Sequence, residues 1–458
     1  MFIGRKKEVE KMNSFLNDNK KRVFAVYGRR RVGKSELINY CLENSKKNYL
    51  YYECKQTTER NNIDSIVDLL CEKYELPFIS FKSFEDLLKY IFKLATEEFI
   101  LVLDEYPYLR EIIDGLDSVM QTVIDQNKKS KLKIILCGSY IDIMKTLFEH
   151  DNPLYGRIEE KIELQPMDYY DSSLFYPNYS YEDKVKLYSV FGGIPYYNNL
   201  IDTEKTVIEN IIRLIASNGA TLENEITGYL KTQLSKINNA NEAIEILSNG
   251  TYKYNDIYEK SGIEKGPTLI SALDKLVSMG LVSKVSPIND EFNKKKTGYV
   301  ISDPLSHFFY KYVYKNKSRM MVMDNNAFFN KYILDDFNTQ YVPKFFEQIV
   351  KEYLIRMNKK GKIKEPFDKI GKYYYDNPIK HTNGEFDVVT HDDKGYIFYE
   401  VKFKEKPLAK EIAEEEIKQV KETSLNCYKY GFVSKSGFDF YDESLIQINI
   451  DEMYNLDE

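Results

Sequence analysis

A glycine-rich octapeptide near the N-terminus constrains the fold of this chain more than any other feature. The residues from Gly28 to Ser35 read GRRRVGKS; they follow the apolar run RVFAVY and open the helical pattern SELINYCLE. A G-x-x-x-x-G-K-[ST] match between a strand and a helix predicts a loop whose backbone amides surround phosphate. We therefore expect bound ATP, with Lys34 on its β- and γ-phosphates and the Ser35 hydroxyl on Mg²⁺.

The whole loop is predicted to contact the nucleotide: Gly28, Arg29, Arg30, Arg31, Val32, Gly33, Lys34 and Ser35. A second apolar run, FILVLDEY, ends in Asp104, which we expect to hold Mg²⁺, and in Glu105, which could orient an attacking water. Ser139, at the end of IILCGS, either senses the γ-phosphate or is an ordinary small residue at a strand end. Arg157 either adds positive charge at the γ-phosphate, as an arginine finger does, or forms a surface ion pair.

The order of apolar runs predicts an α/β protein with several domains. Up to about residue 165, the runs RVFAVYG, NYLYYEC, EFILVLDEY and LKIILCGS alternate with amphipathic helical patterns, which is typical of a parallel sheet. Three helical patterns and two extended segments between 240 and 302 follow the order of a winged helix-turn-helix. We expect a P-loop ATPase core over 1–165, a helical lid over 166–236, a winged helix over 237–303, a helical connector over 304–334 and a small α/β domain over 335–458.

The predicted third helix of the winged helix, from Thr268 to Met279, offers few side chains that read base edges. Lys294, Lys295 and Lys296 at the predicted wing tip could touch phosphate, but lysines in a loop are usually solvated. We therefore expect this domain to pack between other parts of the chain more readily than to read a DNA sequence.

Composition limits the partners, the cellular location and the metals that we expect for this protein. The net charge of −6 argues against a permanent electrostatic grip on nucleic acid, so such contact must be local or regulated. No apolar leader and no run of about 18 apolar residues is visible, which predicts a cytoplasmic protein without membrane contact. The cysteines form no Cys-x-x-Cys pair and the histidines have no metal-ligand spacing, so we expect free thiols and no zinc.

The stretch GEFDVVTHDDKGYIFYEVKFK, from Gly384 to Lys404, carries charges inside two predicted strands. It is either a solvated sheet surface or a metal site. A helix with Glu347 precedes it, and the order of elements resembles the PD-(D/E)XK nuclease core, with Phe386 where the motif has Pro. That resemblance implies that Asp387 and Glu400 bind Mg²⁺, that Lys402 positions or activates water and that Glu347 assists.

The motifs FIGRKKEVEKM, YGRRRVGKSELI, LVLDEYPYL, LCGSY, PLYGR, GGIPYY and ISDPLSHFFYKYV together resemble the archaeal-type ATPase family of the STAND class of P-loop NTPases. A branch of that family carries a winged helix and a C-terminal domain resembling restriction endonucleases. The resemblance implies that FIGR (Phe2 to Arg5) lies near the adenine and that GGIP (Gly192 to Pro195) belongs to a lid over the nucleotide.

Two functional hypotheses remain open at this point. The first is an ATP-hydrolysing protein whose nucleotide state controls a Mg²⁺-dependent nuclease-like domain, with nucleic acid, preferably DNA, as its partner. The second is an ATP-driven regulatory or scaffolding switch, in which the nuclease-like domain binds nucleic acid or a regulatory protein without cutting. Either is compatible with oligomer formation on nucleotide binding.

Overall fold

The computed structural model describes residues 2–20, 22–77, 79–234, 238–263, 266–293, 295–377, 382–423 and 425–456. Lys294, at the predicted wing tip, and His381, one of the four histidines, lie outside these ranges. The chain divides into two compact units, the first formed by Met1–Pro166 with Ile194–Tyr196 and the second by Met167–Gly193 with Tyr197–Glu458. All five cysteines are free thiols, as predicted.

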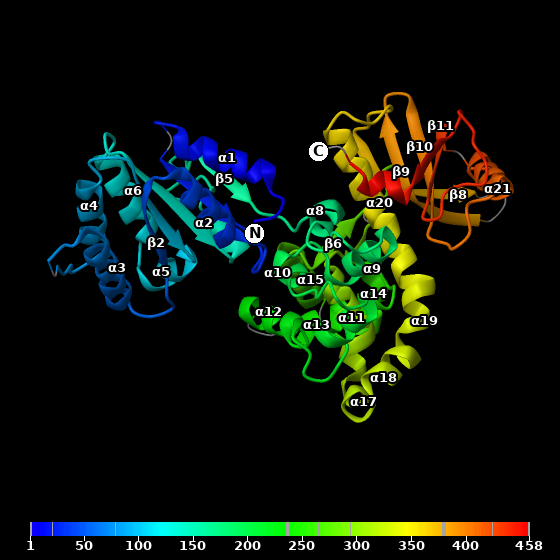
Figure 1. The fold of residues 1–458 in the computed structure, drawn as a ribbon, viewed down its shortest axis with the longest axis horizontal. Helices are drawn as coiled ribbons and strands as arrows, with labels where there is room; N and C mark the ends of the chain where they lie inside the picture. Colours follow the sequence, from blue (N-terminus) through cyan, green and yellow to red (C-terminus); the bar gives the residue numbers. More distant parts are fainter. Residues whose placement is uncertain are drawn as a thin grey trace. The chain divides into compact units, whose positions relative to one another are not determined.

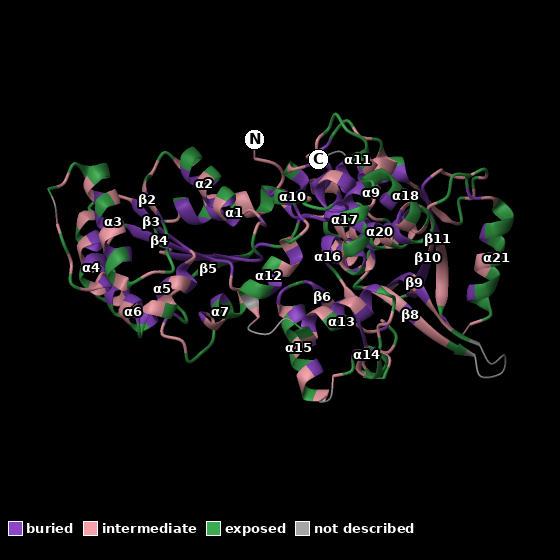
Figure 2. Ribbon diagram, turned by 90° about the horizontal axis from the view of Figure 1, so that it is seen from below, coloured by how far each residue is buried: buried purple, intermediate pink, exposed green. Residues whose placement is uncertain are grey.

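The first unit is built on a five-stranded parallel sheet (Figure 1). Its strands are β1 Val23–Tyr27, β2 Asn48–Glu53, β3 Phe99–Asp104, β4 Leu132–Gly138 and β5 Glu160–Glu163, in the order β2-β3-β4-β1-β5. Every residue of β1, β3 and β4 is buried, which explains their continuous apolar runs (Figure 2). The predicted parallel α/β sheet is therefore present.

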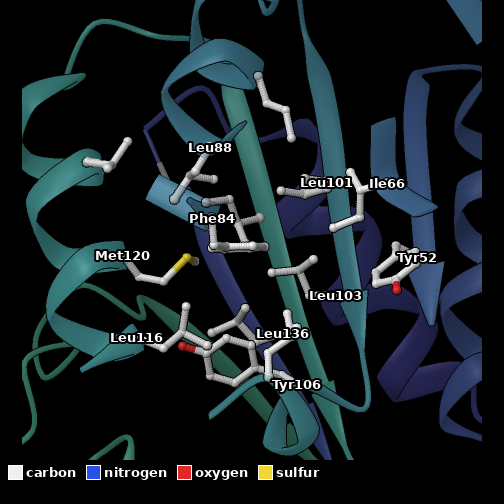
Figure 3. Close-up of a cluster of buried hydrophobic side chains, with 14 of the residues drawn as sticks. Tyr52, Ile66, Phe84, Leu88, Leu101, Leu103, Tyr106, Leu116, Met120 and Leu136 are labelled. Atoms are coloured by element: carbon white, nitrogen blue, oxygen red, sulfur yellow. The ribbon is translucent and has the colours of Figure 1, made fainter. Parts of the chain in front are cut away.

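Helices cover both faces of this sheet. They are α1 Lys6–Asn17, α2 Lys34–Ser45, α3 Glu59–Tyr74, α4 Phe84–Leu94, α5 Tyr106–Ile112, α6 Leu116–Gln126 and α7 Ile141–Thr146. On one face, Phe15 of α1 packs against Phe24 of β1 with ring centroids 4.8 Å apart. On the other, Leu101, Leu103 and Leu136 of the sheet pack among side chains of α3 to α6 (Figure 3). Because the helices pack on the two faces of the sheet, the carboxyl ends of its strands can continue into loops that form a site.

Strand order decides which of those loops meet. β4 lies between β1 and β3, so the segment after β4 is placed between the phosphate-loop motif after β1 and the acidic pair at the end of β3. Parallel strands end at the same edge of a sheet, and this edge therefore collects Lys34, Ser139 and Asp104 from distant parts of the sequence.

The second unit begins with helices and continues into three helices followed by a two-stranded antiparallel sheet. The first helices are α8 Tyr169–Ser173, α9 Tyr181–Phe191, α10 Pro195–Asn199, which crosses the division between the units, α11 Val207–Leu214 and α12 Glu225–Gln233. The next elements are α13 Asn238–Ser248, α14 Tyr254–Ser261, α15 Gly266–Ser278, β6 Val282–Val285 and β7 Gly298–Ile301. This element order is the one the sequence predicts for residues 240 to 302.

A helical path leads from there to the C-terminal sheet. It comprises α16 Pro304–Phe308, a π-helical turn Phe309–Val313, a 3₁₀ turn Tyr314–Asn316, α17 Lys317–Val322, α18 Asn325–Tyr332, α19 Leu334–Asp336, a second π-helical turn Phe337–Tyr341 and α20 Val342–Lys359. None of the described helices combines the length and the apolar character needed to cross a membrane.

The C-terminal sheet is mixed and has the order β12-β11-β10-β9-β8. Its elements are β8 Lys369–Asn377, β9 Thr382–Asp392, β10 Gly395–Lys402, α21 Lys410–Lys421, β11 Cys427–Ser434, β12 Ile446–Asn449 and α22 Ile450–Tyr454. β8, β9 and β10 pair antiparallel, whereas β10, β11 and β12 pair parallel. β9 and β10 form a hairpin within the stretch from Gly384 to Lys404, where the sequence predicts two strands.

The loop between β6 and β7 lies along β8, the edge strand of this sheet. The Ile288 amide donates to the Lys372 carbonyl at 2.8 Å, and the Asn289 side chain bonds both the amide and the carbonyl of Tyr374 at 3.1 and 2.8 Å. Lys296 lies over the Tyr374 ring at 4.2 Å. The predicted wing therefore covers a sheet edge, which satisfies backbone groups that would otherwise remain open to strand pairing.

Candidate functional site

The phosphate-loop motif folds as a tight turn between β1 and α2. A Cβ at Gly28 would lie 2.4 Å from the Leu164 carbonyl oxygen, so only glycine fits there. Gly33, with φ of 95°, adopts the left-handed conformation at the start of α2, where a side chain would be strained. The motif thus places backbone amides at a helix N-terminus, which is the geometry that binds phosphate.

Lys34 occupies the inside of this loop. Its Nζ donates to the carbonyl oxygens of Gly28 at 3.1 Å and Arg29 at 3.2 Å, and to Ser139 Oγ at 2.8 Å. The residue is 5% exposed, so its charge is held among oxygen acceptors. When ATP binds, its β- or γ-phosphate would become the anionic partner of Lys34 in place of these neutral oxygens.

Ser35 and Asp104, the two residues predicted to hold Mg²⁺, lie in contact. Ser35 Oγ donates to Asp104 Oδ2 at 2.7 Å, and Asp104 is only 4% exposed. Mg²⁺ prefers hard oxygen ligands and usually keeps waters and substrate phosphates in its coordination shell. A hydroxyl and a carboxylate beside a phosphate loop therefore fit this ion.

Ser139 connects Glu105 to Lys34. Glu105 Oε2 accepts from the Ser139 amide at 3.0 Å, while Glu105 Oε1 accepts from Ser139 Oγ at 2.5 Å. Glu105 has a positive φ of 52°, an unusual conformation for a non-glycine residue that often marks functional sites. The carboxylate proposed to orient water is thus anchored through the residue proposed to sense the γ-phosphate.

The structure does not place Arg157 at the phosphate loop. Arg157 forms an ion pair with Asp125 of α6 at 2.7 Å and donates to the Pro153 carbonyl at 3.1 Å. It precedes β5, and the following Glu159 amide bonds the Val23 carbonyl, at the beginning of β1. The phosphate loop follows the carboxyl end of β1, whereas Arg157 lies near the amino ends of β1 and β5. Of the two alternatives, the fold therefore adopts the surface ion pair.

The arginines in and beside the phosphate loop differ in their surroundings. The Arg5 guanidinium donates to the Val32 carbonyl at 3.1 Å, which braces the loop from the FIGR motif. The Arg31 guanidinium lies over the Tyr196 ring at 4.2 Å, next to the GGIP motif. Arg29 is buried and Arg30 is exposed. Sequence reasoning missed Tyr196 because its position follows only from the return of residues 194–196 to the first unit.

A second candidate site is a pocket of about 140 Å³ in the C-terminal domain. It is lined by Glu347, Glu385, Phe386, Asp387, Val388, Phe398, Tyr399, Glu400, Val401, Glu416 and Gln419. The pairing of β9 with β10 extends to Val388 and Tyr399, and Asp387 and Glu400 are the next residues of these two strands. The structure therefore brings Glu347, Asp387 and Glu400 together, although they are distant in sequence.

Lys372 and Lys402 form ion pairs with acidic residues that line this pocket. Lys372 of β8 pairs with Asp387 at 2.7 Å and with Glu385 at 3.1 Å. Lys402 pairs with Glu400 and, at 2.9 Å, with Glu416 of α21. Within the described ranges, no three His, Cys, Asp or Glu side chains are arranged to hold a metal ion. Carboxylate oxygens suit Mg²⁺ chemically, but a cation here would have to replace lysine contacts.

Burial raises the pKa values of two acids in this pocket. Burial and then the charge of Asp387 raise the pKa of Glu347 to about 7. Burial also raises the pKa of Glu400, although the Lys402 ammonium opposes this. Lys372 and Glu416 are site residues that sequence reasoning did not assign, because they come from β8 and α21, outside the predicted hairpin. The sequence signal for Lys372 was the position of this lysine in the strand-like run KYYYD.

The first unit, with its phosphate loop and parallel sheet, defines a P-loop ATPase domain, and comparison with known proteins agrees. Residues 2–200 match a family described as an ATPase domain predominantly from Archaea. The Walker-type ATPase of Pyrococcus abyssi has a similar fold, with a TM-score of 0.53 and 18% identity over 68% of this chain and 96% of that one. An ATP-binding protein of Methanocaldococcus jannaschii is 50% identical over 46 residues, which are 10% of this chain and 78% of that protein.

The likeness extends beyond the ATPase domain. Residues 309–420 match a family of archaeal and bacterial proteins of unknown function, and this range contains the carboxylate pocket. An uncharacterised protein of Methanocaldococcus jannaschii is 26% identical over 409 residues, covering 88% of both chains. The combination of both parts in one chain therefore recurs in a relative.

Proposed function

We propose that this protein is an ATP-hydrolysing switch that controls a Mg²⁺-dependent nuclease-like domain acting on nucleic acid, with DNA as the favoured substrate. The proposal includes the finer placements: a STAND-class ATPase, a winged helix over residues 237–303 and a PD-(D/E)XK-like domain over 335–458. The observation that carries it is the pocket in which Glu347, Asp387 and Glu400 meet beside Lys402.

The pocket residues suit phosphodiester hydrolysis. Asp387 and Glu400 would hold Mg²⁺, which when bound supplies positive charge to the phosphate oxygens. Lys402 is close enough to Glu400 to contribute a second positive charge, and Glu347, whose pKa lies at about 7, could accept a proton from water. Bound Mg²⁺ would displace Lys372 from Asp387, because the ammonium group and the metal ion compete for the same carboxylate.

Helix α20 supports the regulatory part of the proposal. Glu347 on this helix lines the pocket, whereas Glu352 and Arg356, further along it, bind the segment that contains α8 and α9. Glu352 accepts from the Tyr169 amide at 3.0 Å and from the Tyr188 hydroxyl at 2.9 Å. A displacement of α8 and α9 would therefore act on the helix that carries a pocket carboxylate.

Charged side chains reinforce this connection. Arg356 pairs with Asp168 at 2.6 Å and with Asp171 at 3.1 Å. Lys435, which directly follows β11, pairs with Glu182 of α9 at 2.9 Å. The segment bound in this way ends at Gly193, and the next residues, 194–196, belong to the ATPase unit. The chain itself thus provides a covalent route from the ATPase domain to α20.

The alternative is a switch whose nuclease-like domain binds without cutting. The pairing of Lys372 and Lys402 with the pocket acids favours it, because lysines that neutralise carboxylates can replace a metal permanently. In that case the pocket stabilises the sheet, and the domain presents a binding surface for nucleic acid or protein.

Cleavage assays distinguish the two. The purified full chain is incubated with plasmid, linear DNA and RNA in Mg²⁺ or Mn²⁺, with and without ATP. We expect wild-type protein to cut DNA, Lys402→Ala and Asp387→Ala to lose cleavage while hydrolysing ATP, and Lys404→Ala, an exposed lysine two residues further along, to behave as wild type. If wild type cuts no substrate in any nucleotide state, or Lys402→Ala cuts equally well, the binding switch replaces this proposal.

Regulation is tested separately with Arg356→Ala. We expect this variant to hydrolyse ATP at the wild-type rate, because Arg356 lies outside the ATPase domain, while the effect of ATP on cleavage is lost. Arg319→Ala, on α17, provides a matched control, since Arg319 has no contact with Asp168 or Asp171 in the described interactions. An unchanged effect of ATP in Arg356→Ala would remove α20 from the regulatory route.

A further inference from the structure

The Asp104 carboxylate receives a hydrogen bond from a residue outside all of the recognised motifs. Tyr51 of β2 donates its hydroxyl to Asp104 Oδ2, the same oxygen that accepts from Ser35 Oγ. β2 is the neighbour of β3, and the register places Glu53 beside Asp104. Tyr51 stands two residues before Glu53 and so shares its face of the sheet, from which its long side chain reaches the carboxylate.

Counting lone pairs shows how tightly this carboxylate is held. Each carboxylate oxygen offers about two acceptor positions. Oδ2 accepts from both hydroxyls, and Oδ1 accepts from the Glu105 amide at 2.9 Å. Donors from three different parts of the chain therefore restrict the rotation of Asp104.

The two hydroxyls on Oδ2 come from different elements. Ser35 directly follows Lys34 at the start of α2, and its oxygen can turn a lone pair toward Mg²⁺ while its proton stays on Asp104. Tyr51 lies on β2 and donates to the same oxygen, so its hydrogen bond orients the acid.

We propose that Tyr51 is a positioning residue of the ATPase site, which holds Asp104 in the orientation that Mg²⁺ requires when it binds with ATP. Without the Tyr51 hydroxyl, Oδ2 regains a free lone pair, and the rotation of the carboxylate is restricted by fewer donors. The Mg²⁺ ion would then meet a less ordered ligand. The loss should appear as weaker Mg²⁺ binding and not as weaker binding of ATP itself.

The chain offers a matched control in the next residue. Tyr52 also donates a buried hydrogen bond, to Asn62 Oδ1 at 2.6 Å, but it points to the other face of the sheet, toward α3. Tyr51→Phe and Tyr52→Phe each remove one oxygen atom from one strand and should cost similar stability. Only the first removes a donor from Asp104.

The test measures binding of a fluorescent, non-hydrolysable ATP analogue as a function of Mg²⁺, together with the Mg²⁺ dependence of ATP hydrolysis. For Tyr51→Phe we expect the Mg²⁺ concentration at half-saturation to rise about three- to tenfold in both assays, which is the typical net contribution of one hydrogen bond. Nucleotide affinity in EDTA should stay unchanged, and Tyr52→Phe should match wild type in all three measurements.

Two results would overturn the proposal. One is a wild-type Mg²⁺ dependence in Tyr51→Phe, which would make its hydrogen bond purely structural. The other is an equal shift in Tyr52→Phe, which would show that any weakening of β2 disturbs the site. Thermal unfolding monitored by circular dichroism shows whether both variants are folded at the assay temperature, and the binding assay in EDTA reports whether the phosphate loop is intact.

Discussion

The Tyr188 hydroxyl donates a hydrogen bond of 2.9 Å to the Glu352 carboxylate, and this bond joins helix α9 to helix α20. The two residues are 164 positions apart in the sequence. Glu352 also accepts from the Tyr169 amide at 3.0 Å, so one acid binds two helices of the preceding segment. The cost of burying this acid makes the junction sensitive to pH.

Glu352→Gln should flatten part of the pH dependence of stability. Burial and then the charge of Asp168 raise the pKa of Glu352 from 4.5 to about 7. The folded protein therefore holds this proton more tightly than the unfolded chain, and the stabilisation is lost as the pH rises from about 4.5 to about 7. The full effect is at most about 3 kcal/mol.

The measurement is urea unfolding at a series of pH values from 4.5 to 8, followed by circular dichroism. Glutamine keeps an acceptor for Tyr188 and Tyr169 but cannot ionise, so the variant should lose less stability than wild type over this interval. Glu411→Gln, on the exposed side of α21, serves as the control. Parallel curves for wild type and Glu352→Gln would show that this acid does not carry the dependence.

Lys34→Ala should weaken ATP binding and abolish measurable hydrolysis. The variant removes the charge that lies inside the loop, 2.8 Å from Ser139 Oγ, and leaves the turn at Gly28 and Gly33 intact. We expect at least a tenfold loss of affinity, about 1.4 kcal/mol. Isothermal titration with ATP and a phosphate-release assay check this, with the exposed Lys7→Ala as control. Wild-type affinity and turnover in Lys34→Ala would refute the assignment of the loop.

Glu105→Gln should bind ATP normally and hydrolyse it slowly. The introduced amide could still accept one hydrogen bond from Ser139, so the site should remain assembled, but an amide is a poor base and a weaker partner for water. General-base contributions of about 10²- to 10⁴-fold set the size of the expected fall in kcat, with little change in KM. Steady-state kinetics separate the two constants, and a kcat equal to that of wild type would exclude Glu105 from the water-orienting role.

Arg157→Ala should leave ATP hydrolysis by the isolated monomer unchanged. Its ion pair with Asp125 is partly exposed, so the loss of stability should be small, about 0.5 kcal/mol. Asp125→Ala should have the same small effect on the unfolding midpoint in urea. A selective loss of kcat in Arg157→Ala alone would show that the arginine reaches a nucleotide in some other arrangement.

Features encoded in short, contiguous stretches were predictable from the sequence. The phosphate loop is eight consecutive residues whose glycines, lysine and serine have fixed roles, and buried parallel strands appear as continuous apolar runs. Asp387 and Glu400 belong to one hairpin, so alternation along the strands and the turn between them were sufficient to predict that they meet. In these cases local backbone geometry determines the contact.

Tertiary structure decided the contacts between elements that are distant in the sequence. The sequence left two interpretations of Arg157, and only the parallel pairing of β5 with β1 placed it at the end of the strands away from the loop. Tyr51 reaches Asp104 because β2 pairs with β3, and Lys372 reaches Asp387 because β8 pairs with β9. No periodicity marks such partners, since they depend on which strands are neighbours and in which register, and the packing of whole elements determines both.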